Sequence, residues 1–243
     1  TGGGSTGGPS LIQFVQDAQV SEGDCNFVTS LDSPQLANPI TTGDVLVAAV
    51  TYGSYPSLGS AIQTTVFDDF GNTFTQVDDY YDVPLAQGLR DFYVVVGPAG
   101  PNDGFHVSFS PEANCVGLYV AEYAGADPVA PIAAHGNGED ADAGPGTDVL
   151  SLALAAPAAP ALFWAFGYDS AVGQQPFGFV AGTGFTPRGP PEGVWAWGNG
   201  TFEGRPEEQQ VADAGALLAT WSVGTESTFI LEGFVLGLPD AGP

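Results

Sequence analysis

The segment from Phe67 to Asp82, FDDFGNTFTQVDDYYD, concentrates acidic and aromatic side chains around a Gly-Asn turn. Its aspartates are Asp68, Asp69, Asp78, Asp79 and Asp82. Carboxylate and amide oxygens are the ligands that Ca²⁺ prefers, and glycosidases use paired carboxyl groups. The same pattern is typical of a solvated β-hairpin, in which the Gly-Asn pair reverses the chain. The segment therefore predicts a cation site, an acid pair or a plain hairpin.

Spacing divides these aspartates into two groups, because a strand rises about 3.3 Å per residue and the ends of the segment cannot share one ion. We expect the group at the turn to hold a structural Ca²⁺, with Asp68, Asp69 and Asn72 as ligands. The acidic stretch 139–148 offers a second set, namely Glu139, Asp140, Asp142 and Asp148. Neither follows the spacing of an EF-hand, so calcium is an expectation from ligand type.

Aromatic residues indicate a binding surface. Sugar rings stack on flat aromatic faces, while neighbouring Asp and Asn side chains form hydrogen bonds with the hydroxyl groups. Trp195 and Trp197 in GVWAWGNG (193–200) would share one face of a strand near a turn, and Tyr80 and Tyr81 follow the second acidic group. The alternative is that both tryptophans fill the core, as large aromatics commonly do.

Catalytic residues are harder to find in the sequence. Sandwich glycosidases and lyases carry carboxylates at alternating strand positions facing one groove, but Glu122 is the single acid on its predicted strand. Residues 3–7, GGSTG, match Gly-x-Ser-x-Gly only inside the Gly-rich tether, so no nucleophile elbow follows a predicted strand. His106 and His135 alone do not make a three-ligand zinc site. We predict no catalytic residue, and a glycan-cleaving hydrolase or lyase stays a further alternative.

The charge balance restricts the partners. The 243-residue chain has 28 acidic residues, three arginines and no lysine, for a net charge of -25. Nucleic acids and anionic membranes are held by Lys and Arg, so nucleic acid is excluded as a partner and anionic membranes are disfavoured. Schiff-base chemistry and a P-loop are excluded by the missing lysine. The acidity itself fits a saline setting, since salt screens the repulsion between carboxylates, or divalent-cation binding.

Cys25 and Cys115 lie far apart in the sequence, outside any CxxC motif. We predict a disulfide between them, which would stabilise the fold by about 4 to 5 kcal/mol on the chain-entropy model and indicates an oxidising compartment. Two buried free thiols are the alternative.

Short apolar runs separated by turn residues predict strands. With 35 glycines and 20 prolines the chain is unsuited to helices, and 105–110 alternates apolar and polar residues. Expected strands are 11–20, 44–52, 62–68, 73–81, 90–96, 105–110, 116–123, 162–168, 217–223 and 227–237. The uncharged run 149–168 resembles a membrane span in length, but Pro157 and Pro160 favour a strand, a turn and a second strand.

Residues 1–10, TGGGSTGGPS, predict a flexible tether at the start of a processed chain, 11–238 a single β-sandwich domain, and 239–243 a frayed tail. LVAAVTYGS (46–54) is echoed by LFWAFGYDS (162–170). The echo predicts two similar sets of strands, which would suit the two sheets of one sandwich. Residues 135–148 would then form a long surface connection.

The succession GDVLVAAV (43–50), VFDDFGNTFTQV (66–77), HVSFS (106–110) and VAEYAGADPVAPI (120–132) resembles a recurrent domain of secreted bacterial proteins. The second half matches more loosely, through GFTPR and FILEGFVLG. Such domains are jelly-roll, concanavalin A-like β-sandwiches, often attached to cell surfaces and mostly without an assigned activity. The resemblance implies an all-β antiparallel fold for residues 11–237 and carries no catalytic residue.

Together these patterns predict a secreted or cell-surface, non-catalytic module that binds a polysaccharide or another surface polymer. A structural subunit of an extracellular layer or fibre, formed by self-association, is the alternative.

Overall fold

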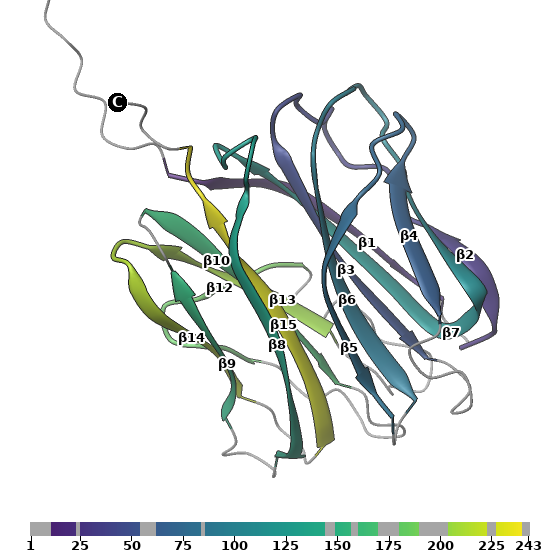
Figure 1. The fold of residues 1–243 in the computed structure, drawn as a ribbon. Coiled ribbons are helices and arrows are strands. Elements are labelled where there is room, and N and C mark those ends of the chain that lie inside the picture. Colours follow the sequence, from purple (N-terminus) through teal and green to yellow (C-terminus); the bar gives the residue numbers. More distant parts are fainter. Residues whose placement is uncertain are drawn as a thin grey trace, which may run out of the picture.

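The computed structural model describes residues 11–22, 25–53, 62–83, 86–143, 149–156, 160–169, 180–189, 204–222 and 227–239. In these ranges the chain forms fifteen β-strands and no helix, and every strand pairing is antiparallel (Figure 1). This confirms the predicted all-β sandwich class. None of the described segments is a helix that could cross a membrane.

The first half of the chain builds one pair of sheets. Its strands are β1 (Gln13–Ser21), β2 (Val28–Asp32), β3 (Val45–Gly53), β4 (Gln63–Asp68), β5 (Thr75–Asp82), β6 (Gln87–Val95) and β7 (Phe105–Ala124). The inner sheet has the order β1-β7-β3-β6-β5, and β2 and β4 pair with the first part of β7 to form an outer sheet. The 20-residue β7 therefore belongs to both sheets. We call this half the first sandwich.

The second half repeats this strand order. Its strands are β8 (Ile132–Ala143), β9 (Val149–Ala156), β10 (Ala161–Asp169), β11 (Val180–Ala181), β12 (Thr186–Pro187), β13 (Gly204–Val211), β14 (Gly215–Ser222) and β15 (Ser227–Gly237). The inner sheet reads β8-β15-β10-β13-β12 and the outer sheet β9-β14-β11. β7 has two arms, a first part in the outer sheet and a last part in the inner sheet. In the second half two separate strands take these places, β14 in the outer sheet and β15 in the inner sheet. We call this half the second sandwich.

The four sheets stack with the inner sheets in the middle, which creates three apolar cores. One core lies inside each sandwich, between its inner and outer sheets. The third, the central core, lies between the two inner sheets and contains Val47 and Tyr119 from one and Trp164 and Phe234 from the other. Sheets covered on both faces need apolar side chains at nearly every position. This explains the fully buried pattern along β3.

The sequence echo identifies equivalent strands but not equivalent faces. It aligns Leu46 in β3 with Leu162 in β10, and both strands are the third in their inner sheets. Leu46 faces the core inside its sandwich, whereas Leu162 faces the central core. A one-residue offset turns every side chain to the other face of a strand. Each set of strands also forms two sheets of its own rather than one sheet of a shared sandwich.

Two expected connections are different in the structure. Residues 67–82 form a hairpin only at the turn, where the Asp68 N–H donates to the Asn72 carbonyl (3.1 Å) and the Phe74 N–H to the Val66 carbonyl (2.9 Å). Beyond the turn the two strands separate, because β4 pairs with β7 and β5 pairs with β6. The acidic segment 135–148 is not simply a surface connection, because β8 occupies its first part and pairs with β15 along the edge of the inner sheet. The polar side chains of β8 hid this strand from pattern reading.

The predicted disulfide is confirmed. Cys25 and Cys115 are bonded across a sequence separation of 90 residues, with Cα atoms 3.9 Å apart. Cys115 lies where β7 leaves its partners in the outer sheet and joins those of the inner sheet. The bond therefore ties the β1–β2 connection to the bend in β7.

The two ends of the described chain meet the connection between the sandwiches at one corner (Figure 1). Gln13 at the start of β1 pairs with Ala124 at the end of β7. At the end of β15, the Gly237 N–H donates to the Pro131 carbonyl (2.9 Å) and its carbonyl accepts from the Asp127 N–H (2.8 Å).

Candidate functional site

The turn after β4 uses its polar side chains to close the corner between the sheets. Asp68 is 3 % exposed, and its Oδ1 accepts from the backbone N–H groups of Phe70 (3.0 Å) and Asn72 (2.8 Å). The Asn72 side-chain amide donates to the other Asp68 oxygen and to the Pro98 carbonyl (2.9 Å). N–H donors thus surround Asp68 where a Ca²⁺ would need free oxygens.

Asp69 points away from this turn. It accepts from the Gly104 N–H (3.0 Å) and lies against Nε2 of His106 (2.9 Å). Asp103 lies buried between the two aspartates, and burial together with the charge of Asp68 raises its pKa to about 7. Among the described residues no three His, Cys, Asp or Glu side chains are placed to hold a metal ion. The N–H groups at Asp68 would compete with a cation for its oxygens, and calcium at Asp68, Asp69 and Asn72 stays a prediction from residue type.

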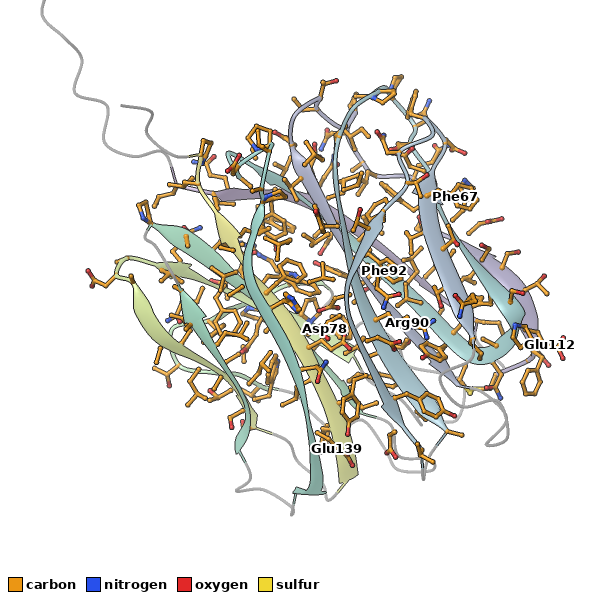
Figure 2. The ribbon with its side chains drawn as sticks, in the orientation of Figure 1. Phe67, Asp78, Arg90, Phe92, Glu112 and Glu139 are labelled. Atoms are coloured by element: carbon orange, nitrogen blue, oxygen red, sulfur yellow. A yellow bond between two sulfur atoms is a disulfide. The ribbon has the colours of Figure 1, made fainter. Side chains whose placement is uncertain are left out.

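The outer face of the first sandwich carries an exposed aromatic pair. The Phe67 ring is stacked on the His106 ring, with centroids 5.0 Å apart and planes at 26°. Asp32 and Asp69 contact the two imidazole nitrogens, at 2.8 and 2.9 Å. Burial lowers the pKa of His106, but the hydrogen bonds to both carboxylates outweigh it and leave that pKa raised. Phe67 projects from β4 to the solvent in Figure 2.

The rest of this face is rich in hydroxyl groups. On the central strand β7, Ser108 lies opposite Ser30 of β2 and Thr65 of β4, and Ser110 lies opposite Gln63. The face combines a stacked ring pair, two carboxylates as acceptors and a row of hydroxyl and amide groups.

The predicted aromatic residues are placed differently. Tyr81 is stacked on Tyr52 at 6.2 Å, and the Tyr80 hydroxyl donates to Glu139 of β8. Both tyrosines therefore make contacts within the molecule, in addition to any contact with a ligand. Trp195 and Trp197 lie outside the described residues, in the connection between β12 and β13. The other two tryptophans, Trp164 and Trp221, are fully buried.

Acidic side chains also gather inside the molecule, along the β5 and β8 side of the central core. Asp78 of β5 lies opposite Asp91 of β6, and Glu232 of β15 lies opposite Asn137 of β8. Asn137 and His135 reach across from the second sandwich to Asp78, and the His135 Nδ1 to Asp78 oxygen distance is 3.0 Å. In Figure 2, Asp78 lies between β5 and β8. We call this group the acidic seam.

Asp91 and Glu232 are the fully buried members of the seam. Each is 0 % exposed, and none of their four carboxyl oxygens has a side-chain hydrogen-bond partner among the described residues. Burial raises the pKa of Asp91 well above its usual range, and the charge of Asp78 acts in the same direction. Burial and the charges of Asp91, Asp78 and Asp79 do the same for Glu232, while the Tyr80 backbone N–H opposes them.

On the opposite side of the central core, a buried acid has a cationic partner. Glu208 of β13 is 5 % exposed, accepts from the Tyr123 hydroxyl (2.6 Å) and is paired with the Arg188 guanidinium. Arg188 also lies over the Phe14 ring at 4.0 Å. Here a cation and a hydroxyl compensate the buried acid, whereas no described side chain does so for Asp91 and Glu232.

Other buried acids hold local structure. Glu122 accepts from the Gln16 side-chain amide (2.6 Å) and the Thr41 N–H (2.9 Å), which fixes the segment before β3. Glu207 faces the core of the second sandwich and accepts from the Gly182 N–H (3.0 Å).

The sequence patterns do not single out Asp91 and Glu232 as functional residues. The available signal was a lone acid inside a long apolar run, as in RDFYVVV and FILEGFVLG, which predicts a carboxyl group inside the core. Comparison with family models, with curated proteins and with solved structures found no match.

Proposed function

We propose that this protein is a non-catalytic, secreted or cell-surface module that binds a polysaccharide on the outer face of the first sandwich. The observation that carries the proposal is the exposed Phe67–His106 stack between Asp32 and Asp69. Phe67 is 37 % exposed, and the side chains of Asp32 and Asp69 are 72 % and 49 % exposed. A sugar ring would stack on the aromatic pair while its hydroxyl groups donate to the carboxylates.

The distribution of the other acids supports binding over catalysis. A general acid or nucleophile must reach the substrate within hydrogen-bond distance. Asp91, Glu207 and Glu232 are 0 % exposed, and Asp68 and Asp103 lie under a turn. The disulfide supports an oxidising compartment, and hence the proposed location outside the cytosol.

Strand order supports the more specific jelly-roll assignment. If the two arms of β7 are counted separately, the inner sheet contains the first, eighth, third, sixth and fifth strands, and the outer sheet the second, seventh and fourth. This nested order resembles that of a jelly roll, and the second sandwich has a similar one. A concanavalin A-like relationship rests on the sequence resemblance.

The test is binding of the full chain to a panel of soluble polysaccharides, measured by glycan array and calorimetry. Phe67→Ala should weaken binding about five- to thirtyfold, because one stacked ring contributes on the order of 1–2 kcal/mol. Val129→Ala, at a residue 89 % exposed on the connection between the sandwiches, is the matched control and should bind like the parent.

Binding that survives Phe67→Ala but is lost in a Trp195→Ala, Trp197→Ala double variant would move the site to the β12–β13 connection. Absence of binding to every polysaccharide, with or without EDTA, would overturn the proposal. If the protein binds a polysaccharide without EDTA and loses this binding when EDTA is added, the expected Ca²⁺ is required for binding.

A structural role is the second candidate, favoured by the outer sheet of the second sandwich. Strands β9, β11 and β14 contain no charged residue, although the chain has a net charge of -25. The outward positions of this sheet include Val180 and Leu218, which are 59 % and 54 % exposed, next to Ala153 and Ala216. The strands of this sheet would themselves present no charged side chain to a second copy of the chain.

A further inference from the structure

The acidic seam places two fully buried carboxyl groups at the interface between the sandwiches. Asp91 comes from the first sandwich and Glu232 from the second, so any interaction between them acts between the two halves of the molecule. Both side chains lie on the faces that form the central core. Asp91 is paired across the sheet with Ala49 and Glu232 with Phe166, and both of these partners belong to that core.

An ionised pair at this position would be strongly unfavourable. Two buried carboxylates without side-chain hydrogen-bond donors have lost their hydration and repel each other. At the rim, the His135 ring contacts Asp78, and the His135 side chain is itself 54 % exposed. Arg90 does not compensate the pair, because its guanidinium contacts Asp79, the Ile62 carbonyl and the Tyr52 ring.

The charged and titratable neighbours of this pair come from both sandwiches. They are Tyr52 of β3, Asp78, Asp79, Tyr80 and Asp82 of β5, Arg90 of β6, and His135 and Glu139 of β8. The Tyr168 hydroxyl of β10 donates to the Gln87 side chain at 2.7 Å. Negative charges outnumber positive ones in this set. A third acid is not positioned to complete a metal site in the described ranges, so the proton is the cation that fits.

We propose that Asp91 and Glu232 bind protons as neutral carboxylic acids, and that they form a pH-sensitive clamp between the two sandwiches. The contrast with Glu208 supports this, because the same interface neutralises a buried acid with Arg188 at its other side. When the clamp loses its protons, the charges of Asp78, Asp91 and Glu232 push β5 and β6 away from β8 and β15. The clamp acts on the joint between the halves and does not depend on polysaccharide binding.

The direction of the effect follows from proton linkage. A carboxyl group whose pKa is raised by folding binds its proton more tightly in the folded state. The folded state is then favoured most at a pH below the unfolded pKa of about 4, and stability falls as the pH rises through the range between the unfolded and the folded pKa.

The experiment compares the melting temperature of the parent with that of an Asp91→Asn, Glu232→Gln double variant at about pH 5 and about pH 8. The two amides imitate neutral acids, so the variant should stay close to the parent at the lower pH. At the higher pH it should melt on the order of 5 °C above the parent. Hydrogen exchange should show that the parent, but not the variant, loses protection in β5 and β8 at the higher pH.

Glu208→Gln is the matched control, since it changes a buried acid at the same interface that already has a cation. It should lower the melting temperature at both pH values, because Arg188 loses its charged partner. If the double variant does not fold, the single Asp91→Asn and Glu232→Gln variants should each show part of the same pH-dependent gain.

A gain that is equal at both pH values, or absent at the higher one, would overturn the proposal. The proposal would also be overturned if millimolar Ca²⁺ raised the melting temperature of the parent at the higher pH but not that of the double variant. That result would identify a metal ion as the bound cation. The polysaccharide affinity of the double variant should equal that of the parent, which separates this test from the test of Phe67.

Discussion

At the scale of single residues, the fate of each carboxyl group is decided by what surrounds it. Asp68 accepts from three N–H donors and Glu208 is paired with Arg188, so each of these buried carboxyl groups has its partners inside the molecule. Glu207 is also fully buried, and within the described residues its Oε1 has no hydrogen-bond partner. Burial raises the pKa of Glu207 to about 8, although the backbone N–H groups of Gly182 and Thr220 act against it.

Glu207→Gln should therefore stabilise the protein increasingly as the pH rises. The raised pKa means that the folded parent keeps its proton up to about pH 8 and loses up to about 1.4 kcal/mol of stability per pH unit above the unfolded pKa. The variant has no such loss and still offers an oxygen to Gly182. Urea unfolding between about pH 5 and pH 8 measures the difference.

Glu112→Gln, at an exposed residue at the bend of β7 (Figure 2), is the control and should follow the parent at every pH. A constant difference between Glu207→Gln and the parent over this range would contradict the expectation.

At the scale of strands, the stacking of four sheets limits which backbone positions tolerate a side chain. Gly233 of β15 lies against the backbone of β10. A Cβ at this position would be 2.6 Å from the Trp164 carbonyl oxygen and 3.0 Å from the Ala165 Cα. Gly138 of β8, in the neighbouring strand, has open space around the same position.

Gly233→Ala should thus destabilise the protein by about 2–3 kcal/mol or more, because backbone atoms of a central strand would have to shift. Gly138→Ala should change the free energy of unfolding by less than about 0.5 kcal/mol. Both values come from denaturant titrations followed by circular dichroism. Equal stability of the two variants would show that β10 and β15 can separate without cost.

Strand-level prediction from the sequence worked where burial was regular. β3, β10 and β15 were expected because sheets covered on both faces need continuous apolar runs. β8 and β13 were missed because HGNGEDADA and GRPEEQQV do not alternate, and several of their polar side chains serve the acidic seam or an ion pair. The Gly-Asn pair before Thr73 predicts a hairpin, but a turn sequence does not reveal which sheet the next strand joins.

The candidate binding face could not be predicted from the spacing of residues in the sequence. Phe67 and His106 are far apart in the sequence and meet only because β4 pairs with β7 in the register that sets them opposite each other. The predicted Asp68 and Asp69 belong to one turn, but the first serves that turn and the second the exposed face.

At the scale of the whole molecule, the two outer sheets differ sharply in polarity. The outer sheet of the first sandwich presents Asp32, His106 and several hydroxyl groups, whereas the strands of the second contain no charged residue and expose Leu218. The acidic charge of the rest of the chain opposes association at low ionic strength, and salt screens it.

We therefore expect concentrated protein to associate in high salt through the outer sheet of the second sandwich. Leu218→Asp should shift the sedimentation profile back to the monomer, because it places a charge on an apolar contact. Val129→Asp adds the same charge outside this sheet and should associate like the parent. A parent that stays monomeric at every salt concentration would exclude the structural role.

The corner where Gln13, Gly237 and the 127–131 connection meet has a mechanical consequence. A force that separates the two ends would pull β1 off β7 and β15 off its neighbours from the same corner. The hydrogen bonds of each strand would then break one after another, as in a zipper, instead of all sharing the load. Pulled this way, the protein should yield at low force, although its layers are densely packed, and the Cys25–Cys115 bond beyond β1 should stop the first unzipping.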